Sequence, residues 1–363
     1  MKYRFAIIGS GWRAAYYMRI AAKLPEIFEL GLVYCRSEEK ALKVSTEWGV
    51  KTTCSEEEIV SYQPDFIVVS VSKSSGAEVA LQWMKRGFTI LAETPAGLDL
   101  STLEALWDAH LSGQKLVIAE QYTRYPTYSA LLRLINEKYI GDVNCINISL
   151  AHDYHGASLM RAFLGLSVDT PFSVRSKAYS FPVTETLTRY EKYDDGRVAL
   201  KKRTAAVFEF DNGKVAFYDF DSEQYRSPIR RCSYRISGIR GEITDGVVRF
   251  LDEENRAVEE SLKTEIIRHE TGAANPNFAF TDEIAKITFK DRILYEAPFG
   301  IAKLSEDETA VALLMRQTAE YARGNEESPY QLRDALQDAY MSILMHESES
   351  EDKMIRSSRK KWM

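Results

Sequence analysis

Short apolar segments alternate with amphipathic segments over the first 120 residues of the chain. The apolar segments are strand-sized and are bounded by glycine, proline or polar residues, so they predict buried strands. These predicted strands are Tyr3–Ile8, Leu30–Cys35, Phe66–Val71, Thr89–Ala92 and Leu116–Ala119. Predicted helices between them are Trp12–Leu24, Lys40–Trp48, Ala77–Arg86 and Thr102–His110. Buried strands that alternate with helices are typical of a parallel sheet covered on both faces, so we expect a doubly wound α/β (Rossmann) domain.

The pattern changes after residue 122, where alternating strands and turns become common. Asp211-Asn212-Gly213 predicts a tight hairpin turn, because Asn-Gly readily adopts positive φ angles. The elements predicted here are a helix at Tyr128–Asn136, strands at 146–150, Ala205–Phe210 and Val215–Phe220, a strand and turn at Ile236–Ile243, and helices from Ser305 to Gly324 and from Gln331 to His346. We therefore expect an α+β domain with a large open mixed or antiparallel sheet, and a division into domains at 1–122 and 123–363.

Composition narrows the class of protein further. Apolar residues make up 45% of the chain and charged residues 28%, which is average globular usage. A net charge of −6 argues against a broad nucleic-acid-binding face, and no apolar run approaches the roughly 20 residues of a membrane helix. The first residues lack the apolar core of a signal peptide, and the four cysteines contain no CxxC pair. We expect a cytoplasmic protein that binds neither nucleic acid nor membrane.

A glycine-rich loop follows the first predicted strand and leads into the first predicted helix. Its residues include Gly9, Gly11, Trp12, Arg13 and Ala14. The first glycine allows a tight turn, the second lets the backbone approach a pyrophosphate, and the alanine allows close packing of helix on strand. The N–H groups at the start of the helix then face the anion. We predict that these five residues bind a dinucleotide.

The end of the second predicted strand indicates which dinucleotide is bound. A carboxylate there would accept a hydrogen bond from a free ribose 2′-hydroxyl, but this strand is followed by Arg36 and Ser37. An arginine can bind a 2′-phosphate with two parallel hydrogen bonds or stack on adenine. NADP is therefore favoured over NAD. The alternative is a surface arginine paired with Glu38 or Glu39.

Several short motifs carry a resemblance to a known family. Besides the Gly9 loop, they are Glu93-Thr94-Pro95, Arg124-Tyr125-Pro126, Gly141-Asp142-Val143, His155 and Gly238-Ile239-Arg240-Gly241. In this order they resemble the Gfo/Idh/MocA oxidoreductases over essentially the whole chain. The resemblance implies an N-terminal Rossmann domain, NAD or NADP as cofactor, and a sugar, cyclitol or related polyol as substrate. It also implies a homodimer or homotetramer formed through the open sheet of the second domain.

Thr94 stands where the resemblance places a lysine that contacts the nicotinamide ribose and the substrate hydroxyl. A threonine can hydrogen-bond the cofactor, but it carries no charge and is a poor acid or base at neutral pH. The resemblance implies that Glu93, Thr94 and Pro95 contact the cofactor. It also places Ser72 and Lys73 in a loop beside the cofactor ribose, where Lys73 is a candidate catalytic residue. The alternative for Lys73 is a phosphate-binding or solvent-facing lysine.

Polar, titratable residues are concentrated between the predicted strand at 146–150 and a predicted apolar helix at Leu159–Leu164. They are His152, Asp153, Tyr154 and His155. His155 matches the motif histidine of the family, which implies that it exchanges a proton with the reacting hydroxyl; an unperturbed pKa of about 6.5 suits that role. Tyr154 is a second catalytic candidate, and His152 and Asp153 are candidates for substrate binding. The alternative for His155 is a hydrogen-bonded structural histidine.

Three further expectations concern the same region. The family's aspartates four residues before and three residues after the motif histidine are Ala151 and Ser158 here, which leaves Asp153 as the candidate orienting carboxylate. No metal site is predicted, because the chain has five histidines and no cysteine near this cluster. Tyr122 and Arg124 begin the second predicted domain and are candidates for binding substrate, with packing between domains as the alternative.

The function predicted from these features is hydride transfer between a nicotinamide and a hydroxyl or carbonyl carbon of a polyol. Two alternatives stay open. One is redox-neutral glycoside cleavage or lyase chemistry, in which tightly held NAD is reduced and reoxidised within one turnover. The other is a nucleotide-binding sensor without catalysis, which the absence of the motif lysine permits.

Overall fold

Six parallel strands form the centre of the first unit of the chain. The structure is a computed structural model and describes residues 1–272 and 279–363. The first unit comprises Met1–Arg124, Glu306–Ala339 and Trp362, and the second comprises Tyr125–Ser305, Tyr340–Lys361 and Met363. The functional division of the chain at residue 122 remains a prediction, because compactness alone does not assign a cofactor or a substrate to either unit.

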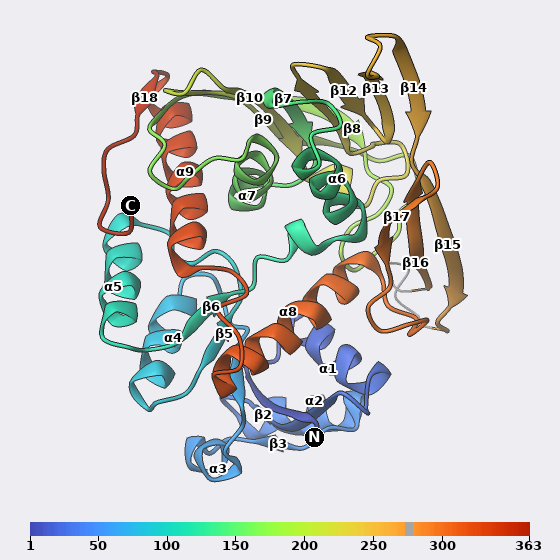
Figure 1. The fold of residues 1–363 in the computed structure, drawn as a ribbon. Coiled ribbons are helices and arrows are strands. Elements are labelled where there is room, and N and C mark those ends of the chain that lie inside the picture. The colour runs from blue at the N-terminus through green and yellow to red at the C-terminus, as the bar shows by residue number, and fades with distance from the viewer. Residues whose placement is uncertain (273–278) are drawn as a thin grey trace. The chain divides into compact units, whose positions relative to one another are not determined.

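The first unit alternates strands and helices in the way the hydrophobic pattern predicts (Figure 1). Its strands are β1 (Tyr3–Ile8), β2 (Phe28–Tyr34), β3 (Thr52–Thr53), β4 (Phe66–Val69), β5 (Ile90–Ala92) and β6 (Leu116–Ile118). Its helices are α1 (Ala14–Lys23), α2 (Glu38–Trp48), α3 (Glu56–Tyr62), α4 (Gly76–Lys85), α5 (Leu100–Leu111), the 3-10 turn η1 (Tyr122–Arg124) and α8 (Glu306–Arg323). The strand order β3-β2-β1-β4-β5-β6 places the reversal of winding between β1 and β4, where doubly wound sheets bind ligands.

The second unit contains a large mixed sheet and a small antiparallel one. Its helices are α6 (Pro126–Asn136), α7 (Asp153–Leu164) and the 3-10 turn η2 (Ser222–Tyr225), and α9 (Leu332–Glu351) belongs to both units. Its strands are β7 (Val143–Ser149), β8 (Phe172–Thr184), β9 (Val198–Phe210), β10 (Val215–Asp221), β11 (Ser233–Gly238), β12 (Gly241–Thr244), β13 (Val247–Leu251), β14 (Ala257–Ser261), β15 (Lys263–Glu270), β16 (Phe280–Phe289), β17 (Arg292–Glu296) and β18 (Ile355–Arg356).

The large sheet has the order β14-β13-β12-β11-β7-β10-β9-β8-β18. β7 and β10 pair in parallel, and the other neighbours are antiparallel. β9 and β10 form the predicted hairpin, with Gly213 at a φ of 81° in the turn. α7 lies against β7 and α6 packs on α7 (Figure 1). A parallel Rossmann sheet followed by a mixed, largely antiparallel sheet confirms the predicted fold class.

Two predicted helix boundaries are wrong in the second unit. The helix after the polar cluster begins at Asp153 and not at Leu159, so Asp153, Tyr154 and His155 form its first turn. The last helix continues past His346 to Glu351, where the sequence is polar. Ser348 is fully buried in this last turn, and its hydroxyl donates to the carbonyl of Lys353 (2.6 Å). A buried polar contact thus stabilises a helix end that has no apolar signal.

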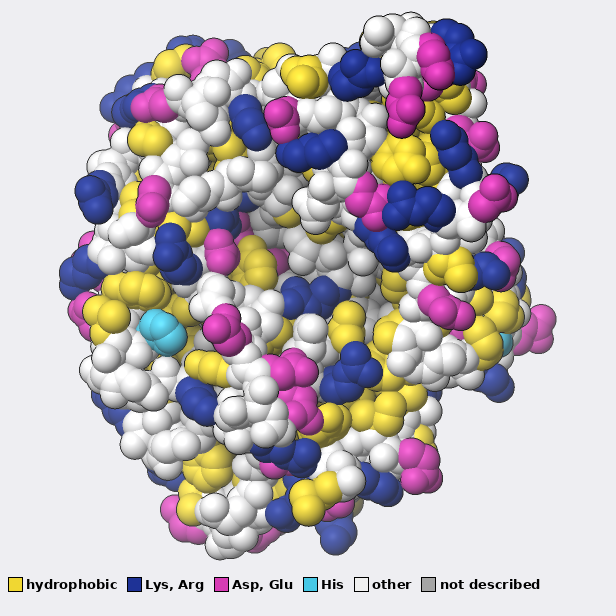
Figure 2. Space-filling view, viewed as in Figure 1, with side chains coloured by type: hydrophobic (Ala, Val, Ile, Leu, Met, Phe, Trp, Pro, Cys, Tyr) yellow, Lys and Arg dark blue, Asp and Glu magenta, His cyan; other side chains and the backbone are white. Residues whose placement is uncertain are grey.

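Charged side chains of both signs are interspersed over the face of the molecule drawn in Figure 2. Among residues 1–272 and 279–363, no helix is long and apolar enough to cross a membrane. The same described residues contain no cluster of three or more His, Cys, Asp and Glu side chains arranged to hold a metal ion.

Candidate functional site

The predicted phosphate loop connects β1 to α1, and its first glycine is required by the fold itself. Gly9 has a φ of 113°, which L side chains rarely adopt. A methyl group at Gly9 would lie 2.1 Å from the carbonyl oxygen of Ser70, directly after β4. The N–H of Gly9 donates to the carbonyl of Tyr34 at the end of β2 (3.2 Å). Gly9 therefore lets the three central strands end close together.

The second glycine has a different explanation. Gly11 is exposed, and a methyl group there would meet no heavy atom within 4 Å in the described part of the chain. No internal contact therefore requires a glycine at this position, whereas close approach by a ligand would. Ala14 opens α1 and is fully buried. A bare backbone at the N-terminus of a helix suits a pyrophosphate, so the loop fits a bound dinucleotide.

Arg13 and Glu93, both predicted to contact the cofactor, are bonded to each other. The Arg13 Nε donates to Glu93 Oε1 (2.9 Å), and its Nη1 donates to Asp307 Oδ2 on α8 (2.5 Å). The Tyr17 hydroxyl also donates to Glu93 Oε1 (2.5 Å). Burial lowers the pKa of Arg13, but the carboxylates of Asp307 and Glu93 outweigh it and hold this pKa well above its usual value. This ion-paired cluster ties the phosphate loop to the strand end that carries Glu93.

The neighbouring loop residue Trp12 packs its ring on Tyr16, with the ring centroids 4.8 Å apart.

Arg36 and Ser37 lie directly beyond the end of β2. Ser37 is the N-cap of α2, where its Oγ accepts from the N–H of Lys40 (3.4 Å). Arg36 is exposed and forms no ion pair with Glu38, Glu39 or any other described residue. Its guanidinium is therefore available to an anionic ligand at this edge of the sheet.

The ends of β4 and β5 carry the other predicted cofactor contacts. Ser72 and Lys73 are exposed in the loop between β4 and α4, and the Ser72 hydroxyl lies 3.2 Å from that of Ser75. Thr94 and Pro95 follow β5, are partly exposed and are joined by a cis peptide bond. Ser72, Thr94 and Pro95 thus follow neighbouring parallel strands at the same edge of the sheet as Gly9.

Tyr122 and Arg124 belong to the first unit, in η1. Tyr122 is buried, and its N–H donates to Glu120 Oε1 (3.1 Å). The Arg124 guanidinium donates to Gln317 Oε1 (3.0 Å) and to the carbonyl of Pro329. Burial lowers the pKa of Arg124 below its usual value. These bonds give Arg124 a structural role in the first unit, and its predicted contact with substrate stays a prediction.

The second unit brings the predicted polar cluster together where β7 leads into α7. Asp153 opens α7 with a φ of 46°, an uncommon conformation for a residue other than glycine. Its N–H donates to the Tyr218 hydroxyl (3.1 Å). Gly156 allows this close approach, because a methyl group there would lie 2.7 Å from the Tyr218 ring. Burial, followed by the charge of Asp153, raises the pKa of Tyr218 well above its usual value, so this hydroxyl is neutral.

His155 lies at the centre of a group of rings. It is 6% exposed, and its ring centroid lies 4.5 Å from that of Tyr154 and 4.9 Å from that of His152. The main-chain N–H of His155 donates to the main-chain carbonyl of His152 (3.1 Å). Burial and aromatic contacts hold the imidazole in one place, which both a catalytic and a structural histidine require.

Each ring nitrogen of His152 has a tyrosine partner. Nδ1 lies 2.6 Å from the Tyr225 hydroxyl and Nε2 lies 3.0 Å from the Tyr154 hydroxyl. The main-chain N–H of His152 also donates to the Tyr225 oxygen (3.0 Å). Sequence reasoning missed Tyr225, which is 73 positions further along the chain and lies in no motif.

A second missed residue is His346 on α9. Its Nε2 lies 3.0 Å from Asp153 Oδ1, and its side chain is 45% exposed. The hydrogen bond to Asp153, opposed by partial burial, raises the pKa of His346 above its ordinary value. The predicted orienting carboxylate thus holds a histidine from another helix, and no local sequence signal could have identified this pair.

The geometry of the first unit defines a class of protein. Its strand order, the Gly9–Gly11 loop at the switch point and the helix that follows are those of a dinucleotide-binding Rossmann domain. Residues 3–121 match the family model of the Gfo/Idh/MocA proteins, described as an oxidoreductase family with an NAD-binding Rossmann fold. The first unit therefore contains the NAD-binding Rossmann domain of this oxidoreductase family.

Solved structures extend the likeness in fold to the whole chain. Levoglucosan dehydrogenase, in complex with NADH and levoglucosan, is 15% identical over 99% of this chain and 100% of that chain, with a TM-score of 0.68. A putative myo-inositol dehydrogenase from Sinorhizobium meliloti is 16% identical, over 98% and 99%, with a TM-score of 0.64. A putative NADPH-dependent oxidoreductase from Desulfitobacterium hafniense is 15% identical, over 98% of both chains, with a TM-score of 0.66. Comparison with curated proteins found no match.

Proposed function

We propose that the protein transfers a hydride between a nicotinamide dinucleotide and a hydroxyl or carbonyl carbon of a sugar, cyclitol or related polyol. The observation that carries the proposal is the bare backbone at Gly11, beside a helix N-terminus at the switch point of the sheet. The substrate class is supported by the shared fold with proteins described as levoglucosan and myo-inositol dehydrogenases.

The dinucleotide would be held by residues of the first unit. Gly9, Gly11, Trp12, Arg13 and Ala14 would hold its pyrophosphate through the backbone, since the Arg13 guanidinium is occupied by carboxylates. Bound there, the dinucleotide supplies the hydride acceptor or donor. The partly exposed residues after β4 and β5 would contact its nicotinamide half. Those residues are Ser72, Lys73, Glu93, Thr94 and Pro95.

Residues of α7 would act on the substrate. His155 would take the proton of the reacting hydroxyl in oxidation and return it in reduction, with Tyr154 and Lys73 as further acid–base candidates. His152 and Asp153 would contact the other substrate hydroxyls. Replacing His155 with Asn should lower kcat about 100-fold while changing the cofactor Kd less than about threefold. An unchanged kcat would contradict the role of His155.

NADP is the cofactor we favour, because Arg36 and Ser37 stand beyond β2 and the Arg36 guanidinium has no protein ion partner among the described residues. Arg36→Ala should weaken NADP binding about 10- to 100-fold, the range of a charge-assisted hydrogen bond, and leave NAD binding within about twofold. Lys85→Ala, which removes an exposed positive charge from α4, is the matched control. Calorimetric titration measures both affinities, and equal losses for the two cofactors would contradict the assignment.

Thr94 supports a second candidate function. Its hydroxyl makes no hydrogen bond with the described residues, and it stands where the resemblance places a lysine. A site without that base suits redox-neutral glycoside cleavage, in which the cofactor is never exchanged. Mass spectrometry of the dinucleotide released when the purified protein is denatured, together with its stoichiometry, distinguishes the two reactions. Near-stoichiometric NAD would favour the redox-neutral reaction, and an empty protein would favour an exchanging dehydrogenase.

We also propose that the protein forms a homodimer or homotetramer and that it is located in the cytoplasm. Exposed apolar side chains on the large sheet, among them Phe217 on β10 and Leu251 on β13, support an oligomer. Light scattering of the purified protein would measure the number of subunits.

A further inference from the structure

We propose that Cys35 and Cys54 form a redox-sensitive pair of thiols beside the phosphate loop, and that hydrogen peroxide joins them in a disulfide that weakens dinucleotide binding. The inference rests on the proposed function, because it places the pair next to the dinucleotide that the first unit would hold. It adds a modification site and a form of regulation to that function. Such a pair suits the cytoplasmic location we propose, where disulfides are transient and redox-sensing.

The two cysteines are neighbours across β2 and β3. These strands pair in parallel, and the last pair is Tyr34 opposite Thr53, so the next positions in the register are Cys35 and Cys54. The main-chain N–H of Cys35 donates to the carbonyl of Thr53 (2.9 Å), which belongs to the peptide group directly before Cys54. Neighbouring strands lie about 4.8 Å apart, and a disulfide spans Cα separations of about 4.4–6.8 Å. The backbone therefore meets the first requirement of a disulfide.

The strand alternation directs both side chains to one face of the sheet. Successive residues of a strand alternate between the two faces, so each cysteine shares its face with the residue two positions before it. Those residues, Val33 and Thr52, are paired with each other and point to the same side. Burial raises the pKa of Cys35, a hydrogen bond with Ser10 lowers it, and a negative charge on Cys54 raises it again. The two thiols are thus within electrostatic reach of each other.

Cys35 lies between the phosphate loop and the edge strand β3. The sheet order β3-β2-β1 places Cys54 on one side of β2 and the loop after β1 on the other. A hydrogen bond links the Ser10 side chain, in the loop, to the Cys35 thiol. A sulfur atom bonded to Cys54 carries no proton and is drawn toward β3, away from Ser10. The thiol contact with the loop and the disulfide therefore exclude each other.

Loss of this contact should affect the dinucleotide through the loop and through the end of β2. Ser10 lies between Gly9 and Gly11, whose backbone would receive the pyrophosphate. Arg36, which we propose for the 2′-phosphate of NADP, follows Cys35 directly. A shift of the Cys35 side chain toward β3 would displace both neighbours. We expect the disulfide form to bind NADPH and NADH at least about 10-fold more weakly than the dithiol form, the effect of about one lost hydrogen bond.

The two thiols differ in access, which gives them different roles in the oxidation. Cys54 is exposed and meets dissolved peroxide first, whereas Cys35 is 2% exposed. The Cys54 thiolate attacks one oxygen of hydrogen peroxide, the O–O bond breaks, and a sulfenic acid and one water form. The Cys35 sulfur then attacks the sulfenic sulfur, the S–O bond breaks, and the released hydroxide takes up the thiol proton to leave as a second water. Two thiols are oxidised to one disulfide, and one peroxide is reduced to two waters.

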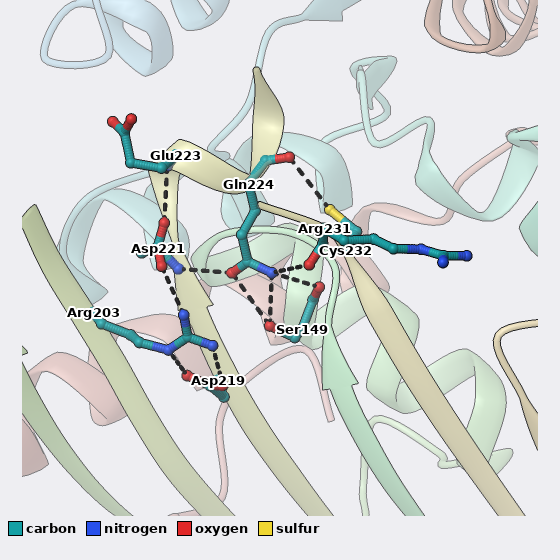
Figure 3. A network of polar contacts seen from close by, with 8 residues as sticks. All are labelled: Ser149, Arg203, Asp219, Asp221, Glu223, Gln224, Arg231 and Cys232. Carbon is teal, nitrogen blue, oxygen red and sulfur yellow. Dashed lines mark hydrogen bonds and ion pairs between the residues drawn. The ribbon is translucent and has the colours of Figure 1, made fainter. Parts of the chain in front are cut away.

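The other two cysteines lie near opposite ends of β11 in the second unit. Cys145 is paired with Ser237, whereas Cys232 directly precedes the first residue of the strand. A strand rises about 3.3 Å per residue, so this separation exceeds the range of a disulfide. The Cys232 sulfur lies 3.5 Å from the carbonyl oxygen of Leu150 and 3.7 Å from that of Gln224, within the polar network of η2 (Figure 3). These two cysteines serve as internal controls.

The first test identifies the disulfide itself. The reduced protein is treated with hydrogen peroxide, alkylated with iodoacetamide in denaturant, digested with trypsin and analysed by mass spectrometry. Cleavage after lysine and arginine places the two cysteines in separate peptides, 24–36 and 52–73. We expect these peptides to be joined, lighter by two hydrogen atoms than the sum of the two, while both control cysteines are alkylated. Oxidation of Cys54 to a sulfinic acid with Cys35 still alkylated would overturn the proposal.

The second test measures dinucleotide binding in the two redox states. Calorimetric titration with NADPH and with NADH should show the loss of at least about 10-fold in the oxidised protein, and dithiothreitol should restore the affinity. Cys54→Ser should bind as the reduced wild type does and should not respond to peroxide. Cys145→Ser, the matched control, should respond as the wild type does.

Two outcomes of this titration separate the inference from the proposed function. A protein that carries the disulfide and binds dinucleotide as the reduced form does would refute the inference alone. A reduced protein that binds neither dinucleotide would refute the proposed function, and the inference with it.

The coupling should also appear in the reverse direction, because two coupled binding equilibria affect each other by the same factor. In a buffer of reduced and oxidised glutathione, saturating dinucleotide should raise the ratio of dithiol to disulfide by the factor measured in the titrations. The alkylated peptides of Cys35 and Cys54 report this ratio. A ratio that does not change on addition of the dinucleotide would show that the thiol pair and the site are not coupled, and would overturn the inference.

Discussion

The two glycines of the phosphate loop should respond in opposite ways to the same substitution. Gly9→Ala places a methyl group 2.1 Å from the carbonyl oxygen of Ser70 and imposes an L side chain on a φ of 113°. Gly11→Ala places a methyl group in open space at a φ that L residues adopt. The first change should damage the fold, and the second should damage only dinucleotide binding.

The magnitude for Gly9 follows from two costs. A positive φ costs an L residue about 1–2 kcal/mol. Ser70 is buried, and its N–H donates to the carbonyl of Ile8 (2.9 Å), so its carbonyl cannot easily move away; overpacking of this kind adds about 1–3 kcal/mol. A total of about 3 kcal/mol lowers the melting temperature of a unit of this size by about 6–12 °C.

Gly11→Ala should leave the melting temperature of the free protein unchanged or slightly raised. Alanine lowers the conformational entropy of the unfolded chain, which raises the free energy of unfolding by up to about 1 kcal/mol. Dinucleotide affinity should fall at least about 10-fold, or about 1.4 kcal/mol. Thermal melts of the free proteins and calorimetric titration with NADPH and NADH measure the two effects. A Gly11→Ala protein that binds either dinucleotide as the wild type does would refute the proposed site.

Further predictions concern buried charge and thiol chemistry. Glu308 on α8 is 3% exposed and accepts from Arg19 (2.7 Å) and Lys23 (2.9 Å), so Glu308→Gln should lower the free energy of unfolding by about 2–4 kcal/mol in denaturant titrations, and a loss below about 1 kcal/mol would contradict this. Burial, followed by the charge of a nearby carboxylate, raises the pKa of Cys232 to about 11, so roughly one thiol in a thousand is ionised at pH 8. Iodoacetamide at pH 8 should therefore modify exposed Cys54 well before Cys232, and equal rates in peptide mass spectra would contradict the raised pKa.

The Rossmann domain was predictable because its signals are local. Each central strand is a short buried apolar run, and Gly9 and Gly11 follow the first of them directly. Even there, α3 (Glu56–Tyr62) was missed, since only Ile59 of its residues is buried and the rest carry no apolar stripe.

The second unit was predictable only in outline. β15 (Lys263–Glu270) is almost entirely exposed. Its sequence lacks the regular alternation of apolar and polar residues that would indicate a half-buried strand. Pairing with β16 defines it, and a pairing partner is not visible in the strand's own sequence. The Asn-Gly hairpin was predicted, because its turn residues determine the geometry by themselves.

In the candidate site, too, only residues that are close together in the sequence were predictable. His152, Tyr154 and His155 were found because they are neighbours in sequence, but Tyr225 and His346 reach them from η2 and α9. A contact of this kind depends on tertiary packing and leaves no spacing pattern. Sequence analysis therefore identified the side chains that define the α7 cluster, and not the partners that set their hydrogen bonds.

Arg13 and Glu93 have a structural role that neither motif indicates by itself, because the two side chains form an ion pair. Taken singly, each reads as a cofactor contact from its own motif, although the two motifs are 80 positions apart. Arg13 binds Glu93 and also Asp307 on α8. These contacts fix the position of the phosphate loop relative to the end of β5 within the first unit. A change at either residue will leave a largely buried charge without its partner and displace the other motif. Loss of dinucleotide binding in such a variant is therefore evidence of positioning, and direct contact has to be tested at Gly11 and Arg36.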